Sequence, residues 1–176
     1  GDQHDPAYRE ISPMSQVPVL ELPDGARISQ SIAILEYLEE THPDPPLLPR
    51  GALARARVRE FTEVINAGIQ PLQNTAVRLH LEQTQGVDIP GWIDRFVGRG
   101  IAALEALAAR SAGRFVVGDA LSFADVVLVP QLYFARRFDL DLAACPTLLR
   151  VEAACAALPC FQAAHAERQP DYPPGA

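Results

Sequence analysis

The stretch "VPVLELPDGARISQSIAILEYLEE", residues 17–40, decides the fold of this protein. Its first part alternates and is rich in β-branched residues, which predicts a strand over residues 17–22. The turn signal "PDG" follows, so "ARIS" at 26–29 is predicted to pair back as the second strand of a hairpin. From Ser31, apolar residues recur at helical spacing up to Pro43. The stretch therefore predicts a hairpin followed by an amphipathic helix.

Two small polar residues, Gln30 and Ser31, stand where the second strand meets this helix. The free N–H groups and the dipole of a helix start favour an anion, and the hydroxyl and amide side chains add hydrogen-bond donors. An ordinary N-cap is the alternative interpretation. The two are compatible, because a hydroxyl can serve a ligand and the backbone in turn.

On either side of this stretch the chain changes character. Residues 7–11 are predicted to form a short helix, because Asp5-Pro6 gives it a favourable start. The segment "HPDPPLLPRG" at 42–51 holds four prolines and reads as a domain linker, with Leu47 and Leu48 expected to anchor it to a core. We therefore expect a partial domain at 1–43, a linker at 44–50 and a helical domain at 51–176.

The second domain is predicted to be almost entirely helical. A long helix over 52–82 must be interrupted near "NAGIQPLQN", because Pro71 removes a backbone donor and clashes with the preceding turn. An amphipathic helix follows at 88–110. The very apolar "SFADVVLVPQLYFARRF" at 122–138 predicts a central helix. Ser122 and Asp125 have the spacing of a capping box, which strengthens the start of that helix.

Composition excludes several classes of function. The 176 residues carry a net charge of −7 with no basic block, which argues against a nucleic-acid partner. The sequence contains no run of 18 apolar residues, so no membrane span is expected. The four histidines and three cysteines follow no metal-ligand spacing, so no metal site is expected. An odd and sparse set of cysteines suits the reducing cytoplasm.

The motifs "SQVPVLEL", "ISQSIAILEYLEETHP", "AGIQPLQN", "VGDALSFADVVLVPQ" and "ARRFDLDL" together resemble the zeta class of glutathione transferases, the maleylacetoacetate isomerase family. The resemblance implies an α/β plus all-α fold: the C-terminal part of a thioredoxin-like domain, then an all-helical glutathione-transferase C-terminal domain. The family's serine and cysteine motif has no match here. The catalytic residue is therefore unknown, and we expect that an N-terminal segment carrying it is omitted from this sequence.

The resemblance implies glutathione as cofactor and assigns residues of the first domain to it. A cis peptide between Val17 and Pro18 would present the Val17 backbone to the tripeptide. Alternatively, Pro18 only begins an edge strand. Gln30 and Ser31 would hold the γ-glutamyl carboxylate, and Gln3 would touch the glycine end.

In the second domain the resemblance places Gln70 and Asn74 at the thiol end of glutathione. The alternative is that Pro71 only shapes the packing and that both polar side chains are solvated. The resemblance also implies that Arg137, the second arginine of "ARRF", binds the substrate carboxylate. Arg137 could instead pair with an aspartate of "DLD", and Arg136 could be solvated or act as a second anchor.

The function implied is glutathione-dependent cis–trans isomerisation of maleylacetoacetate-like dicarboxylic diketo acids, in the breakdown of tyrosine and phenylalanine. The partners are then glutathione, a small acidic substrate and a second copy of the chain in a homodimer. Maleylpyruvate isomerisation and dehalogenation of small α-halo acids are alternatives that use the same residues. A non-catalytic binding protein of this fold and a helical interaction domain without ligand also stay open.

Overall fold

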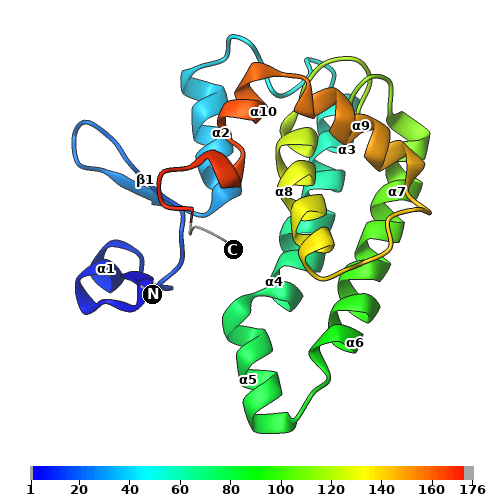
Figure 1. Ribbon diagram of the computed structural model, residues 1–176. Coiled ribbons are helices and arrows are strands. Elements are labelled where there is room, and N and C mark those ends of the chain that lie inside the picture. The colour runs from blue at the N-terminus through cyan, green and yellow to red at the C-terminus, as the bar shows by residue number, and fades with distance from the viewer. Residues whose placement is uncertain (1, 173–176) are drawn as a thin grey trace. The chain divides into compact units, whose positions relative to one another are not determined.

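The computed structural model describes residues 2–172 (Figure 1). The chain divides into two compact units, residues 1–47 and 48–176. The boundary lies inside the segment 44–50 that was expected to be a linker, and Leu48 there is buried while Leu47 is half-buried. In the described part of the chain, no helix is long and apolar enough to cross a membrane.

The first unit contains the predicted hairpin and helix. Its elements are a 3-10 turn at Asp2–His4, α1 at Pro6–Ile11, β1 at Val19–Glu21, β2 at Arg27–Ser29 and α2 at Ser31–Thr41. The strands are shorter than expected. They pair antiparallel, with Val19 opposite Ser29 and Glu21 opposite Arg27. Strand β2 ends at Ser29 and α2 begins at Ser31, so Gln30 alone connects them.

Over residues 48–172 the second unit is almost entirely helical, as predicted. Its elements are α3 at Ala52–Glu63, a π-helix at Val64–Ile69, α4 at Gln70–Gln73, α5 at Thr75–Gln85, α6 at Ile89–Ile93, a π-helix at Asp94–Gly98, α7 at Arg99–Ser111, α8 at Phe123–Arg137, α9 at Pro146–Ala156, α10 at Pro159–Ala163 and a 3-10 turn at Ala166–Arg168.

Helix α8 lies at the centre of this unit and packs against α3 and α9, while α7 packs against α3 and α9 (Figure 1). Leu128 and Leu132 of α8 are fully buried, together with Phe61 of α3, Leu104 of α7 and Leu148 of α9. Each such side chain contributes roughly 1.5–3 kcal/mol by leaving water. The core therefore fixes α8, and through it the residues at both of its ends.

The predicted interruption of helix 52–82 is confirmed. The chain forms the π-helix just before α4, which contains Pro71, and it leaves helical geometry at Asn74 with φ −54° and ψ 133°. Gly100 of α7 allows Ile69 to pack closely, because a Cβ at Gly100 would lie 2.4 Å from Ile69 Cγ1. Packing thus holds the irregular turn against the next helix.

The capping box at the start of α8 is formed. Asp125 accepts hydrogen bonds from the N–H groups of Ser122 at 2.9 Å and Val116 at 2.8 Å, and from the Ser122 hydroxyl at 2.8 Å. Burial of the carboxyl raises the pKa of Asp125, although these three donors act in the opposite direction. Asp125 therefore ties the preceding loop to the central helix.

Helix α8 ends in a Schellman motif. The N–H of Leu140 donates to the carbonyl of Ala135 at 3.1 Å, and the N–H of Asp139 donates to the carbonyl of Arg136 at 3.1 Å. Asp139 takes the left-handed conformation that this motif needs, with φ 54°. The motif fixes where the helix stops, and Arg137 is its last residue.

Candidate active site

In the first unit, the strand register brings the loop before β1 to the start of α2. Extending the pairing beyond Val19 and Ser29 by one residue places Pro18 opposite Gln30. The Gln30 side-chain amide also donates to the Gln16 side chain at 3.5 Å. The loop that carries Val17 and Pro18 therefore lies close to Gln30 at the start of α2.

The predicted cis peptide between Val17 and Pro18 is present. The Val17 side chain is 71% exposed. Over residues 2–172, its backbone N–H and C=O make no hydrogen bond. An exposed backbone with a free donor and a free acceptor can pair with an extended peptide.

A buried serine holds this loop, and sequence reasoning missed it. Ser12 is 2% exposed, and its hydroxyl donates to the Gln16 carbonyl at 2.8 Å. The Tyr8 hydroxyl donates to the same carbonyl at 3.1 Å. The letters "SPMSQ" predict only a loop, so no sequence signal singles out Ser12. Its hydrogen bonds fix the residue directly before Val17.

The start of α2 has no side-chain cap. Gln30 occupies the N-cap position without a side-chain capping bond, and Ser31 is the first helical residue. Gln30 also has a positive φ of 75°, a conformation that costs a residue other than glycine about 1–3 kcal/mol. Strained backbone of this kind gathers at ligand sites. The N–H groups of the first turn thus remain available to an anion.

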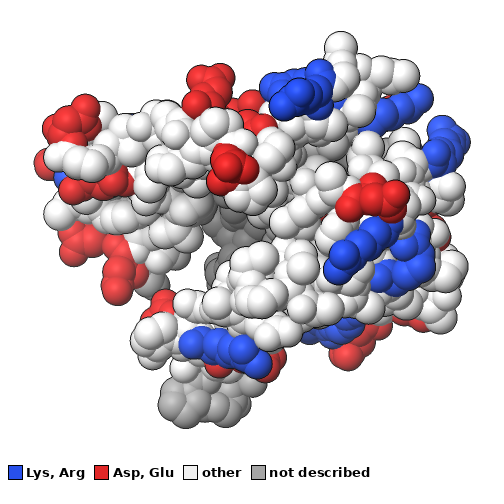
Figure 2. Space-filling model, turned by 90° about the horizontal axis from the view of Figure 1, so that it is seen from above, with Lys and Arg blue, Asp and Glu red and all other residues white. Residues whose placement is uncertain are grey.

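Local donors matter here, because residues 1–47 hold nine acidic residues and two arginines and so carry the whole net charge of −7. Residues 48–176 hold equal numbers of acidic residues and arginines. Figure 2 shows arginine side chains with acidic side chains among them on the visible face. An anion would therefore be held in the first unit by N–H groups and not by a basic surface.

In the second unit, Gln70 belongs to a chain of three side-chain amides. Its amide nitrogen donates to Gln131 at 3.3 Å, and the amide nitrogen of Gln131 donates to Gln73 at 2.9 Å. Gln131 is completely buried in α8. Sequence reasoning missed it, although one glutamine within the apolar run "VVLVPQLYF" was a visible signal. Gln70 is thus more than a solvated side chain.

Asn74 is the N-cap of α5, and its side-chain oxygen accepts from the Ala76 N–H at 2.9 Å. In the part of the chain that the structure describes, its amide nitrogen makes no hydrogen bond and can serve another acceptor. Gln3 lies in the first unit, where its side chain contacts the neighbouring His4 ring at 3.5 Å. Within the described residues, no hydrogen bond links Gln3 to the loop at Val17 or to the start of α2.

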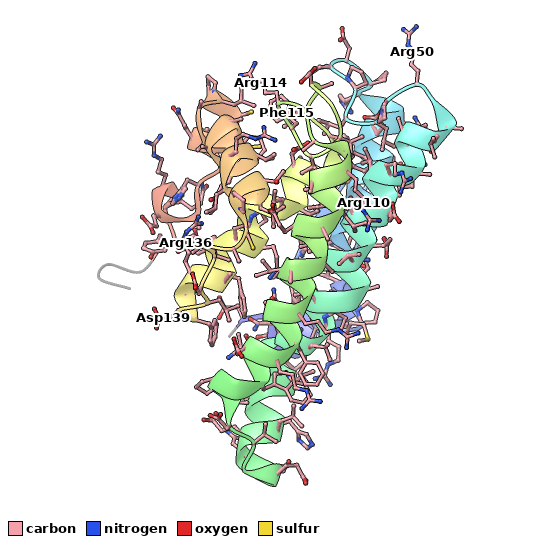
Figure 3. All side chains as sticks on the ribbon, turned by 90° about the vertical axis from the view of Figure 1, so that its right-hand side faces the viewer. Arg50, Arg110, Arg114, Phe115, Arg136 and Asp139 are labelled. Carbon is pink, nitrogen blue, oxygen red and sulfur yellow. The ribbon has the colours of Figure 1, made fainter. Side chains whose placement is uncertain are left out.

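The two arginines at the end of α8 have different surroundings. Arg136 lies between α8 and α9 and forms two hydrogen bonds with Glu152, one of them at 2.6 Å (Figure 3). The hydrogen bond and the charge of Glu152 raise the pKa of Arg136. Arg136 is thus a structural link between helices.

Arg137 is exposed, and over residues 2–172 it forms no hydrogen bond or ion pair. The two aspartates that follow it are used otherwise. Asp139 terminates the helix in its left-handed conformation, and Asp141 accepts from the Ala143 N–H at 2.8 Å. The structure therefore leaves the Arg137 guanidinium available for a carboxylate.

Aromatic residues surround the end of α8. Arg78 of α5 lies 4.7 Å from the centre of the Phe138 ring and donates to the Gln73 carbonyl at 2.9 Å. Tyr133 is one helical turn before Arg137 and contacts the His165 ring edge-on at 5.9 Å. A hydrogen bond with Tyr133 raises the pKa of Tyr172, while the positive charge of Arg137 acts to lower it. These contacts bring phenol hydroxyls near Arg137.

Two family models match the chain. The glutathione S-transferase N-terminal domain matches residues 1–41, and the glutathione S-transferase C-terminal domain matches residues 90–173. The chain is 46% identical over 174 residues to a probable maleylacetoacetate isomerase 2 of Drosophila melanogaster, covering 99% of this chain and 75% of that protein. The chain belongs to the maleylacetoacetate isomerase family, the zeta class of glutathione transferases.

Solved structures of this family agree with the fold described above. The crystal structure of maleylacetoacetate isomerase from Anaeromyxobacter dehalogenans, with GSH bound in its active site, matches with a TM-score of 0.88 and 54% identity, covering 95% of this chain and 79% of that one. A holo structure of a zeta-class maleyl pyruvate isomerase matches with a TM-score of 0.93 and 37% identity, covering 98% and 83%. The α/β plus all-α fold class of the isomerase family is therefore confirmed.

Proposed function

We propose that this protein is a glutathione-dependent cis–trans isomerase of maleylacetoacetate-like dicarboxylic diketo acids. The observation that carries the proposal is the contrast at the end of α8: Arg136 is bound to Glu152, whereas Arg137 has no partner in the described chain. A free guanidinium on a rigid helix end suits a substrate carboxylate. Family membership supplies the class of reaction.

Glutathione is the cofactor of this proposal, and the residues present fit it. The free N–H and C=O of Val17 suit the backbone of a tripeptide. The uncapped first turn of α2 suits a carboxylate, with Gln30 and Ser31 as additional donors. Gln70 and the free amide nitrogen of Asn74 add contacts in the second unit, and Gln3 remains proposed for the glycine end.

When bound, glutathione supplies a thiolate that adds reversibly to the conjugated double bond and turns it into a single bond that can rotate. Arg137 fixes a carboxylate of the substrate and thereby orients the double bond. Its positive charge also stabilises the negative charge that develops on the conjugated carbonyl oxygen. The phenol of Tyr172 lies near Arg137 and is hydrogen-bonded to Tyr133, which leaves the Tyr133 hydroxyl to donate to the same carboxylate.

The test uses protein expressed from its complete reading frame and follows the cis-to-trans conversion of maleylacetone, with and without glutathione. Arg137→Ala is expected to raise the KM for maleylacetone about tenfold to a hundredfold, because a charged hydrogen-bonded contact is lost. Arg136→Ala is the matched control and is expected to change KM less than about threefold. Conversion without glutathione, or equal KM values in the two variants, would contradict the proposal.

Maleylpyruvate isomerisation is the second candidate, because a zeta-class maleyl pyruvate isomerase shares the fold with a TM-score of 0.93. The same free arginine serves either acid. Comparing kcat/KM for maleylacetoacetate and maleylpyruvate on one preparation discriminates between the two. The isomerase proposed here is expected to prefer maleylacetoacetate by about tenfold, since its one additional CH2 group adds apolar contact.

We propose further that the protein is a homodimer in the cytoplasm. Cys145, Cys155 and Cys160 are all unpaired, which supports a reducing compartment. Two-fold dimers are the commonest assembly of soluble enzymes. Light scattering coupled to gel filtration measures the mass directly, and a mass of one chain at micromolar concentration would refute the dimer.

A further inference from the structure

The buried amide of Gln131 is a polar group of α8 that the mechanism above leaves unused. The Gln131 side chain is 0% exposed in the centre of an apolar helix. A primary amide in such a place is costly unless its donors and acceptor are paired. Its oxygen accepts from Gln70 at 3.3 Å, and its nitrogen donates to Gln73 at 2.9 Å.

In the structure these two bonds give each amide of the chain a direction. The Gln131 nitrogen faces the oxygen of Gln73, and the Gln131 oxygen faces Gln70. Gln70 offers one N–H to Gln131. Within residues 2–172 its own carbonyl oxygen and its second N–H make no hydrogen bond, and Gln70 is exposed. Gln70 thus presents one acceptor and one donor, and each can meet a backbone N–H or C=O of a bound peptide.

We propose that Gln131 is a positioning residue, which fixes the Gln70 amide so that its carbonyl oxygen and its second N–H meet backbone groups of glutathione. The inference rests on the proposed function, in which Gln70 binds this tripeptide.

The local backbone explains why such a support is needed. Gln70 begins α4, which has only four residues, lies directly after a π-helix and ends at the break at Asn74. A glutamine side chain there has three rotatable torsions. Ordering it only when the ligand binds would weaken affinity, whereas a side chain ordered in advance avoids that loss. The hydrogen bond from Gln70 to Gln131 orders the Gln70 side chain, because Gln131 lies on α8, which the core fixes.

The experiment measures the Kd of glutathione by titration calorimetry on the full protein. The set is wild type, Gln70→Ala, Gln131→Met and the double variant, with Gln162→Met as the matched control. Methionine fills the volume of glutamine without its polar groups. Gln162 is exposed, and its side chain donates to the Ala156 carbonyl. Melting temperature and the steady-state kinetics of each variant are recorded alongside.

We expect Gln131→Met and Gln70→Ala each to weaken glutathione binding about two- to tenfold, and Gln162→Met to leave it unchanged. In the double variant the Kd should equal that of Gln70→Ala alone, because Gln131 acts through Gln70. The KM for glutathione should rise in Gln131→Met while kcat changes less than about twofold.

Four results would overturn the inference. The first is a lower melting temperature of Gln131→Met with an unchanged Kd, which a purely structural role gives. The second is additivity of the two single effects, and the third is no effect of Gln70→Ala. In these three cases the wild type still binds glutathione, so the proposed function stands. A wild type that does not bind glutathione removes the proposed function and the inference together.

Discussion

Removal of the Asp125 carboxylate should be among the most damaging single changes in the second unit. In Asp125→Ala the buried N–H groups of Val116 and Ser122 lose their acceptor. Each unsatisfied buried donor costs about 1–3 kcal/mol. The desolvation that raises the pKa of Asp125 is relieved at the same time, which offsets part of the loss. We expect a decrease of roughly 3 kcal/mol in the free energy of unfolding.

The assay is urea unfolding followed by the fluorescence of Trp92, the single tryptophan, which lies in the same unit. With a urea dependence of about 1–3 kcal/mol/M, the midpoint should fall by roughly 1–3 M. Asp119→Ala is the matched control, because the exposed Asp119 accepts from the Arg114 N–H at 2.7 Å and water can replace it. Equal midpoints for the two variants would refute the reasoning.

Two further predictions concern other buried groups. Burial acts to raise the pKa of Glu105, but hydrogen bonds from Thr147 and Leu148 at the start of α9 lower it overall. Glu105→Gln should therefore lower the free energy of unfolding by about 1 kcal/mol at neutral pH. The difference in this free energy between wild type and variant should vanish as pH falls through the lowered pKa. A difference that grows toward acid in urea titrations would contradict this prediction. Burial also raises the pKa of the Cys155 thiol to about 12 and raises that of Cys145, whereas Cys160 is exposed. A chromogenic thiol reagent should modify one thiol rapidly, and Cys160→Ser should abolish that phase; rapid modification of all three would contradict the burial.

The sequence by itself predicted the order and type of the elements. The alternation before "PDG" and the helical spacing after Ser31 are local signals, and local hydrogen bonding determines a hairpin and a helix start. The capping box at Ser122 and the interruption near Pro71 are local in the same sense. Strand ends were less well predicted, because β1 and β2 end where pairing ends and not where the β-branched residues end.

Family-specific motifs also predicted the candidate residues, but they did not separate Arg136 from Arg137 on physical grounds. Both arginines are adjacent in sequence and both are long, charged and in the last turn of α8. Only the tertiary structure places Glu152 of α9 beside Arg136 and leaves Arg137 without a partner in the described chain. The choice depends on which side of the helix faces α9, and that is fixed by packing between residues far apart in the chain.

The same reason explains Ser12 and Gln131, which sequence reasoning missed. A serine in a loop has no local signature of burial, and the apolar run around Gln131 indicates burial but not its hydrogen-bond partners, because these are decided by what other segments place around each residue. The sequence determined this protein's elements, since their hydrogen bonds join near neighbours. The tertiary structure decided which polar side chains form hydrogen bonds with other segments. Gln131 and Gln73 are 58 residues apart in the chain, and Arg136 and Glu152 are 16 apart, so no local pattern pairs them.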